Sequence, residues 1–293
     1  MDIARSIFAR MHGVPTADVA VGTQVATFMG LVALSLPAGA RVVAAEEDFT
    51  SVLFPLLAQE PRGVQVDLVP LDRLADALDG ASLVAVSAVQ SADGRFADLD
   101  AIAESGVPAF IDATQACGWL PLDASRFDFF ACGTYKWLLG PRGCTFMSIR
   151  PEAAERLTPH MAGWFAAETP AASYGGPLRL APGARRYDVS PAWFSWVGQA
   201  GALELLERVG IEAINEHDVA LANRFRAGLG LEAGTSAIVS VPPGPGAAER
   251  LRAAGVMFAD HGDLLRFSFH LYTTAADVDR ALEALPATVN PGH

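Results

Sequence analysis

Lysine is almost absent from this chain. Lys136 is the only lysine among the 21 basic side chains of 293 residues, and all the others are arginine. Arginine replaces lysine in ion pairs and on phosphates, but its guanidinium stays protonated and cannot form an imine with a carbonyl compound. A lysine retained at one position therefore indicates Schiff-base chemistry there. The alternative is a general loss of lysine from an alanine- and arginine-rich chain that spared one by accident.

Basic charge, long apolar runs and cysteine are also scarce. The net charge is −12 with no basic run, which argues against nucleic acid and anionic membranes as partners. No stretch approaches the roughly 18 consecutive apolar residues of a membrane-spanning helix, and no leader-like segment opens the sequence, so we expect a cytoplasmic protein. Cys117, Cys132 and Cys144 form no Cys-x-x-Cys pair and no zinc-like pattern with histidine, so we expect buried thiols and no metal.

Apolar residues are abundant, at 51% of the chain, which is ample for a large core. In the first half, strand-like and helix-like patterns alternate, as is typical of a mainly parallel sheet with helices on both faces. We expect strands at residues 19–21, 41–45, 64–69, 83–89 and 109–112, and helices at 3–11, 25–36, 51–58, 71–78 and 98–104.

The second half divides into a loop region and a smaller domain. Glycine, proline and alanine dominate residues 158–191, which we expect to form loops of an active site and an interface. The sequence thus predicts a large domain over residues 1–192 and a small α+β domain over 193–293. For the small domain we expect helices at 193–208, 211–229, 247–254 and 275–285, and strands at 238–241 and 264–269.

Two polar residues interrupt apolar patterns of the large domain. Lys136 follows a strand-like run, and a Gly140-Pro141 turn comes shortly after it. Partial burial there would lower the pKa of its amine and make it a usable nucleophile. Asp112 ends another buried strand, over 107–112. A carboxylate in that place either caps a helix or pairs with a buried cation, and a pyridinium nitrogen is such a cation.

A family signature lies in two stretches, Ile111-Asp112-Ala113-Thr114-Gln115 and Gly133-Thr134-Tyr135-Lys136-Trp137-Leu138. They resemble the class V aminotransferases, a group of pyridoxal-phosphate enzymes that includes cysteine desulfurases, kynureninases and isopenicillin-epimerase-like proteins. The resemblance runs from Asp2 to about Leu285, with four motifs in the expected order. It implies the fold-type I α/β architecture, a mainly parallel sheet between helices, with pyridoxal 5'-phosphate as the cofactor.

The resemblance implies roles for individual residues around the cofactor ring. Lys136 would form the Schiff base with its aldehyde, Asp112 would keep the pyridine nitrogen protonated, and Gln115 would donate to the phenolate oxygen. Phe49 matches the residue that covers the cofactor face, where desulfurases usually have a histidine. A phenylalanine stacks but transfers no proton, which leaves acid–base work to Lys136. The alternative for Phe49 is a place in the core.

The resemblance also implies how the cofactor phosphate is held. Thr23 and Gln24 lie in a strand-to-helix turn, where the Thr23 hydroxyl and backbone N–H groups at a helix N-terminus would bind it. Thr134 matches a second phosphate donor. The segment Arg185–Pro191 resembles, in weakened form, a loop through which a neighbouring subunit reaches the phosphate, with Ser190 in the place of the family's threonine. A homodimer is therefore expected.

Arg266 matches the arginine that grips the substrate carboxylate in this family. A planar guanidinium binds a carboxylate with two parallel hydrogen bonds and so orients the bonds at the α-carbon. The implied substrate is a small amino acid. The alternative is a surface ion pair of Arg266 with Asp263 or Asp277.

Two departures from the family bear on the reaction. Family members carry a longer segment ahead of the first helix, and part of it lines the substrate pocket. This sequence starts almost on that helix, whether naturally, by a wrongly set start or by truncation, so one wall of the pocket stays undefined. Residues 255–263 lack the nucleophilic cysteine of desulfurases, which argues against persulfide transfer.

We therefore expect an enzyme that acts at the α-amino group or α-carbon of a small amino acid, with transamination as the default. A β-eliminating lyase of the C–S or kynureninase type is an alternative, because it starts from the same carbanion. A third interpretation is a non-catalytic relic of the fold with a structural or regulatory role. A Schiff-base aldolase would leave Asp112 and the phosphate turn without a purpose. The identity of the substrate stays open.

Overall fold

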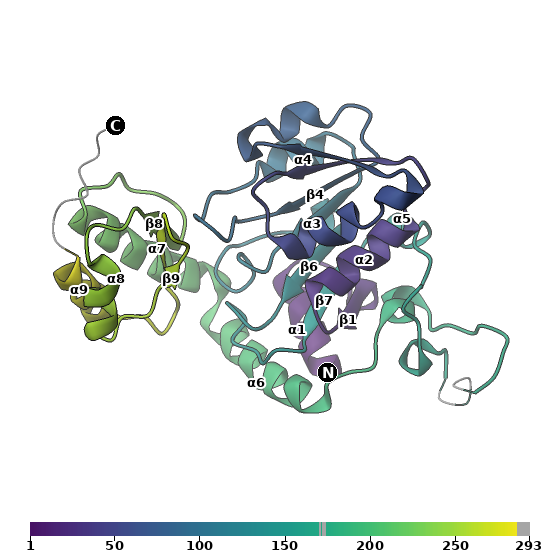
Figure 1. Ribbon diagram of the computed structural model, residues 1–293. Helices are drawn as coiled ribbons and strands as arrows, with labels where there is room; N and C mark the ends of the chain where they lie inside the picture. Colours follow the sequence, from purple (N-terminus) through teal and green to yellow (C-terminus); the bar gives the residue numbers. More distant parts are fainter. Residues whose placement is uncertain (170, 172–173, 286–293) are drawn as a thin grey trace. The chain divides into compact units, whose positions relative to one another are not determined.

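The computed structural model describes residues 1–169, 171 and 174–285 (Figure 1). Two compact units are present. The first joins Met1–Val89 to Ala97–Arg208, and the second joins Gln90–Phe96 to the residues from Val209 on. Units defined by contacts need not coincide with domains that fold independently, so the domain boundary between residues 192 and 193 stays a prediction.

A seven-stranded sheet forms the centre of the first unit, with strand order β1-β7-β6-β5-β4-β2-β3. The pairs β1–β7 and β7–β6 are antiparallel and the other four pairs are parallel, so β7 alone runs in the opposite direction to the rest. The prediction of a mainly parallel sheet is confirmed. The strands are β1 Val19–Gly22, β2 Arg41–Ala45, β3 Gln65–Val69, β4 Leu83–Ser87, β5 Ala109–Asp112, β6 Phe129–Gly133 and β7 Thr145–Ile149.

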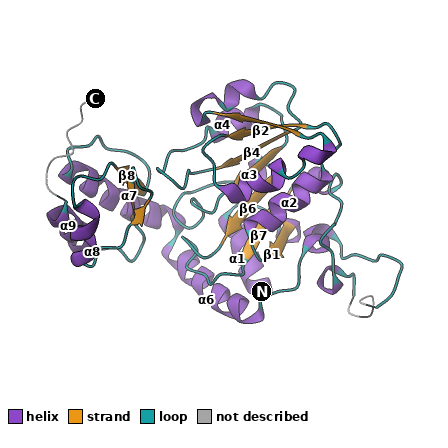
Figure 2. Ribbon diagram, viewed as in Figure 1, coloured by secondary structure: helices purple, strands orange, loops and turns teal. Residues whose placement is uncertain are grey.

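Helices pack on both faces of this sheet (Figure 2). Successive side chains of a strand point to opposite faces, so Phe146 and Met147 of β7 mark the two sides. Phe8 stacks on Phe146 at 4.4 Å between ring centroids, whereas Met147 belongs to the same apolar cluster as Phe28. The helices of this unit are α1 Asp2–Met11, α2 Val25–Ser35, α3 Thr50–Leu57, α4 Leu99–Glu104, α5 Pro151–Ala154 and α6 Trp193–Val209.

The helix expected over 71–78 is wrong. Two separate 3₁₀ turns, Leu71–Arg73 and Ala75–Ala77, take its place. The leucines at 71, 74 and 78 recur at helical spacing and are all buried, which is why the pattern predicted a helix. The two turns, with Leu74 between them and Leu78 after the second, leave all three leucines buried, so periodicity alone does not distinguish this arrangement from a helix.

The second unit is a three-stranded antiparallel sheet with helices. Its strand order is β8-β10-β9, where β8 is Ile238–Val241, β9 is Ala259–Asp260 and β10 is Leu265–Ser268. The helices are α7 Ile211–Gly228, α8 Ala247–Ala253 and α9 Ala275–Ala284. Phe225 of α7 lies 4.7 Å from the ring of Phe267 on β10, inside an apolar cluster. This contact joins α7 to the sheet.

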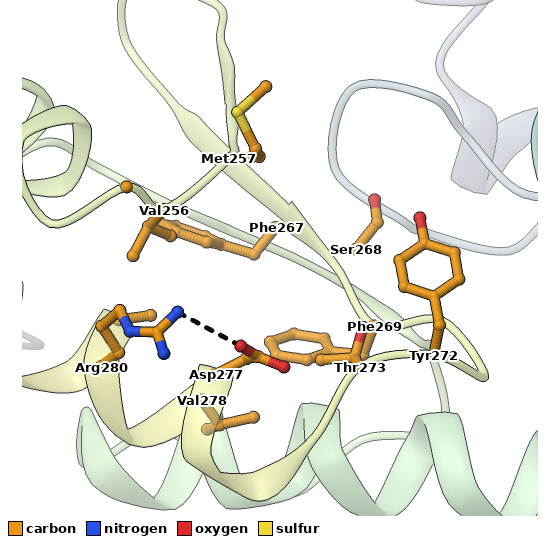
Figure 3. A pocket seen from close by; sticks show the side chains of 12 residues that line it. Val256, Met257, Phe267, Ser268, Phe269, Tyr272, Thr273, Asp277, Val278 and Arg280 are labelled. Atoms are coloured by element: carbon orange, nitrogen blue, oxygen red, sulfur yellow. Dashed lines mark hydrogen bonds and ion pairs between the residues drawn. The ribbon is translucent and has the colours of Figure 1, made fainter.

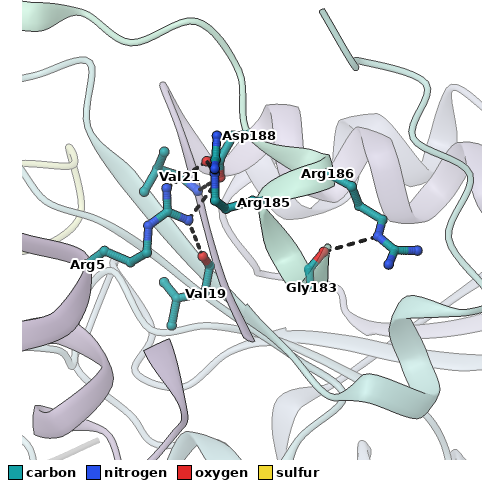
Figure 4. Close-up of polar contacts among 7 residues, drawn as sticks. All are labelled: Arg5, Val19, Val21, Gly183, Arg185, Arg186 and Asp188. Carbon is teal, nitrogen blue, oxygen red and sulfur yellow. Dashed lines mark hydrogen bonds and ion pairs between the residues drawn. The ribbon is translucent and has the colours of Figure 1, made fainter. Parts of the chain in front are cut away.

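A buried ion pair ties the start of the chain to the segment before α6. Arg5 of α1 binds Asp188 at 2.6 Å, and both side chains are almost fully buried. Figure 4 shows Arg5 also donating to the carbonyl of Val19. The same carboxylate accepts from the backbone N–H of Val21 at 2.8 Å. Asp188 therefore attaches the segment 183–190 to β1 of its own chain.

Asp218 of α7 is a second buried carboxylate, and its surroundings differ from those of Asp188. Its side chain is fully buried, and among the described residues neither oxygen has a hydrogen-bond partner. Burial raises the pKa of Asp218 to about 8. In the unfolded chain an aspartate titrates near about 3.9. Between these two values the folded protein binds a proton that the unfolded chain does not, so stability must fall as pH rises.

Because of Asp218, we expect the free energy of unfolding to fall by about 1.4 kcal/mol for each unit by which the pH rises between about pH 5 and 7. Asp218→Asn removes the titration, so its stability should decline less steeply over this range by that amount. The exposed Asp72→Asn is the control and should keep the wild-type slope. Urea unfolding at several pH values measures all three slopes. Equal slopes for wild type and Asp218→Asn would contradict the assignment.

Candidate active site

Lys136 lies in the loop after β6 and is partly buried. Its Nζ sits over the ring of Phe49, 5.6 Å from the ring centroid. Phe49 follows β2, and β2 and β6 run parallel in the sheet, so residues after both strands meet at one edge. Phe49 is 47% exposed, so the alternative that it belongs to the core is wrong.

Asp112 ends β5 at the same edge and is 5% exposed. One of its oxygens accepts from the N–H of Thr114 at 2.9 Å. Residues 113–118 form turns without a helix, so Asp112 is not a helix cap. Burial raises the pKa of Asp112 and the neighbouring Asp48 raises it further, against the lowering effect of Thr114 and Lys136. A cation beside Asp112 would therefore stabilise its ionised form.

Asp48 is a site residue that sequence reasoning missed. It is buried between the ends of β2 and β4, where it accepts from the N–H of Phe49 at 2.6 Å and of Ser87 at 2.7 Å. The hydroxyl of Ser87 also donates to it. Asp48 thereby fixes the backbone from which Phe49 projects. Its only sequence signal is an acidic run, Glu46-Glu47-Asp48, directly after a buried strand.

Gln115 is buried next to two tryptophans. Its side-chain oxygen accepts from the indole N–H of Trp137 at 2.9 Å, and its backbone oxygen accepts from Trp119 at 2.7 Å. An indole nitrogen can only donate, so the bond to Trp137 identifies the amide oxygen and leaves the amide nitrogen as the donor. This orientation suits the predicted donation to the cofactor ring, which stays a prediction.

The predicted phosphate residues differ in their surroundings. Thr23 and Gln24 are exposed at the N-terminus of α2, where backbone N–H groups point out of the helix. The hydroxyl of Thr134 is buried and donates to the carbonyl of Cys144 at 3.1 Å, within reach of Pro141 as well. Because a hydroxyl has one proton, the Thr134 hydroxyl donates it within the protein, and this bond stabilises the loop that contains Thr134. Its phosphate role stays a prediction.

Ser190, the remaining predicted phosphate residue, is exposed. It lies two residues after Asp188, whose bonds to Arg5 and Val21 attach this segment to β1. The neighbouring Val189 adds a backbone bond to Val21 at 3.2 Å. The structure thus holds Ser190 near the end of a strand of its own chain, and its role across a subunit boundary stays a prediction.

Arg266 belongs to the second unit. On β10 its guanidinium donates to the backbone oxygen of Ser91 and, at 3.0 Å, to the Ser91 hydroxyl. Burial lowers the pKa of Arg266. Neither Asp263 nor Asp277 is bonded to it in the described part of the chain, so the alternative of a surface ion pair is wrong.

Asp277 instead pairs with Arg280 at 3.3 Å, beside a cavity of about 320 Å³ at the end of β10 (Figure 3). Apolar side chains such as Val256 and Phe269 line much of this cavity, and Arg266 is not among its lining residues. It is therefore separate from the predicted carboxylate site.

Cys117, Cys132 and Cys144 are all buried free thiols, as expected. Within the described ranges, no group of three histidine, cysteine, aspartate or glutamate side chains could hold a metal ion. None of the described helices combines the length and the apolar character needed to cross a membrane.

Comparison with known proteins identifies the family. The family model Aminotransferase class-V matches residues 1–244. The uncharacterized aminotransferase YcbU of Bacillus subtilis (strain 168) is 31% identical, with 98% of this chain and 83% of that protein covered. Isopenicillin N epimerase of Streptomyces clavuligerus is 30% identical over 62% of this chain, and the match spans 53% of the epimerase.

Solved structures share the fold. The apo cysteine desulfurase from Thermococcus onnurineus NA1 has a TM-score of 0.82 at 21% identity, covering 96% of this chain and 82% of that one. A variant of the lyase C-DES with glycine covalently linked to the PLP cofactor has a TM-score of 0.87 at 19% identity, covering 96% and 83%. The fold-type I architecture is confirmed. The chain belongs to the class V aminotransferase family, and it is a pyridoxal-phosphate enzyme of the aminotransferase or lyase type.

Proposed function

We propose that this protein is an aminotransferase that acts on a small α-amino acid. The observation that carries the proposal is the position of the only lysine, with Nζ 5.6 Å from the Phe49 ring centroid at the sheet edge that holds the buried Asp112. The most extensive match among the curated relatives described above bears the name of an aminotransferase. Residues 255–263 contain no cysteine for persulfide transfer.

The residues at this edge suit pyridoxal phosphate in charge and shape. The buried Asp112 has a raised pKa, so it gains from a cation such as a protonated pyridine nitrogen. Phe49 presents a half-exposed aromatic face to a planar ring. The bond from Trp137 to the side-chain oxygen of Gln115 identifies the other amide atom as nitrogen, a donor group of the type the resemblance assigns to this position. The N-terminus of α2 presents backbone N–H groups to a phosphate.

Each of these residues has a chemical task in transamination. When bound, pyridoxal phosphate supplies an aldehyde that condenses with amines and a ring that withdraws electrons from the α-carbon. Asp112 would support this withdrawal by keeping a proton on the ring nitrogen. Lys136 would hold the cofactor aldehyde, and its amine would move the proton at the substrate α-carbon. Phe49 has no titratable group, so it leaves this transfer to Lys136.

Arg266 is the group that we propose for the substrate carboxylate. Ser91 occupies one guanidinium nitrogen, whereas Nε has no hydrogen-bond partner among the described residues. Burial lowers the pKa of Arg266, and a carboxylate beside it would offset this cost of burying a charge. The site is therefore suited to an anionic group with two oxygens, as in an amino acid.

The first test uses the single lysine. After borohydride reduction, peptide mass analysis should place a phosphopyridoxyl group on the peptide that contains Lys136. Lys136→Arg keeps the charge but cannot form an imine, so it should lose the adduct, and turnover should fall roughly a thousandfold or more. With a keto-acid acceptor, the wild type should convert a panel of small amino acids to their keto acids without release of ammonia.

The products separate this proposal from the alternatives. Stoichiometric ammonia or sulfide would make the protein an eliminating lyase. A folded protein that binds the cofactor but turns over no amino acid would be a relic of the fold. A colourless protein that takes up no added cofactor would overturn the assignment of Lys136.

Arg266→Lys tests the carboxylate site. An ammonium offers a point charge in place of a two-pronged donor, and one charge-assisted hydrogen bond contributes about 1.5–3 kcal/mol. The apparent affinity for an accepted amino acid should therefore drop roughly 10- to 100-fold, with cofactor binding unchanged. Titration against the cofactor absorbance measures it. Arg280→Lys, in the same unit and paired with Asp277, is the control. Equal dissociation constants of the amino acid for Arg266→Lys and wild type would show that Arg266 does not bind the substrate carboxylate.

We also propose that the protein is a homodimer. The first turns of α6 expose large apolar side chains, namely Trp193 at 58%, Phe194 at 93% and Val197 at 76%. Trp193 lies next to the ring of Phe165, at 6.1 Å, so the apolar surface extends beyond the helix. A contiguous exposed apolar patch of this kind marks an interface.

Phe194→Glu should place a charge in that interface and dissociate the dimer, raising the dimer dissociation constant by roughly 100-fold or more. Sedimentation velocity at micromolar concentration measures the change. Met257→Glu is the matched control, because Met257 is equally exposed, at 91%, on the other unit. A monomeric, active wild type would contradict the proposal, and so would a Phe194→Glu variant with unchanged association.

A further inference from the structure

The loop that carries Lys136, residues 134–143, is folded back on itself. We call it the lysine loop. The backbone N–H of Leu139 donates to the carbonyl of Lys136 at 3.1 Å, and that of Gly140 donates to Thr134 at 2.9 Å. Leu139 has a φ of 54°, in the left-handed region that a leucine rarely adopts. A conformation of this kind persists only when surrounding structure holds it in place.

One face of α6 supplies this support. Residues 195, 198 and 199 are spaced i, i+3 and i+4, so they lie on the same side of the helix. Ser195 donates to the carbonyl of Arg142 at 2.9 Å. A β-carbon on Gly198 would lie 3.1 Å from the ring of Pro141, so the helix backbone approaches the loop closely there.

Of the contacts that α6 makes with the lysine loop, the one from Gln199 is nearest to Lys136 along the chain. Its side chain is fully buried, and its amide nitrogen donates to the carbonyl of Leu138 at 3.4 Å. Its amide oxygen has no hydrogen-bond partner in the described part of the chain. That oxygen lies 1.5 Å from the place that a β-carbon would take on Gly140, so a side chain at position 140 would displace the Gln199 amide. The amide therefore contacts the loop on both sides of Leu139.

We infer that Gln199 is a positioning residue for Lys136. Through Leu138 and Gly140 it holds the left-handed turn at Leu139, whose N–H in turn binds the carbonyl of Lys136. The contact acts on Lys136 through the loop backbone. The inference rests on the proposed function of Lys136 for its catalytic meaning, whereas the loop geometry stands without it.

The test again uses the single lysine, here in protein without cofactor. A small acylating reagent labels Lys136, with an added lysine-containing peptide as the internal standard. Gln199→Leu removes the amide contacts, so Nζ should leave the Phe49 ring more often and its relative labelling rate should rise about 3- to 10-fold. Hydrogen exchange in the peptide that contains Leu139 and Gly140 should accelerate on the order of 10-fold.

Gln59→Leu is the matched control. Gln59 is also buried, and its amide nitrogen donates to the backbone carbonyl of Pro55, near the C-terminal end of α3. This variant should lose stability like any buried glutamine replacement, yet leave both the labelling of Lys136 and exchange in the lysine loop at wild-type rates. A general loss of stability is thus separated from an effect on the lysine.

A milder variant keeps the inference testable if Gln199→Leu fails to fold. Ser195→Ala removes one bond from the same helix face, so exchange in the lysine loop should rise by a smaller factor, about 2- to 4-fold. Labelling and exchange at the rates of Gln59→Leu would overturn the inference. A wild type without a cofactor adduct on Lys136 would overturn the proposed function instead, because neither measurement here depends on the cofactor.

Discussion

The cost of burying a carboxylate is the constraint on which the first unit depends. A carboxylate that leaves water must regain hydrogen bonds or a counter-charge. Asp188 meets this requirement with Arg5, and Asp48 meets it with backbone and hydroxyl donors at Phe49 and Ser87. The bonds of Asp188 to Arg5 and of Asp48 to Ser87 also join segments that lie far apart in the sequence. The partners that satisfy the charges therefore hold the strand ends, and the residues that follow them, in place.

Asp112, at the same sheet edge as Asp48, is a buried carboxylate with fewer hydrogen-bond donors around it than Asp48 has. Thr114 donates to one oxygen, while burial and the nearby Asp48 still raise the pKa. A cationic ring nitrogen at this place would satisfy it, which links the energetics of the fold to the cofactor of the family.

The position of Lys136 depends on contacts on two sides. Phe49, from the loop after β2, lies against its Nζ, and α6 supports the loop behind it through Gln199. Both contacts come from elements distant in the sequence. A flexible side chain becomes a defined nucleophile only when such contacts restrict it, because its conformational entropy otherwise favours many positions.

The sequence by itself determined the alternation of strands and helices and the family, and it singled out Lys136 as the proposed nucleophile. The spacing of apolar residues and the presence of a single lysine can be recognised in the sequence without knowing which residues are neighbours in the fold. The helix expected over 71–78 was wrong because buried leucines at that spacing suit two short turns equally. Only the tertiary structure showed the contacts of Asp48 and Gln199, and it excluded the alternative of a surface ion pair for Arg266. Such contacts arise from neighbours that the chain brings together only when it folds, so no local pattern contains them.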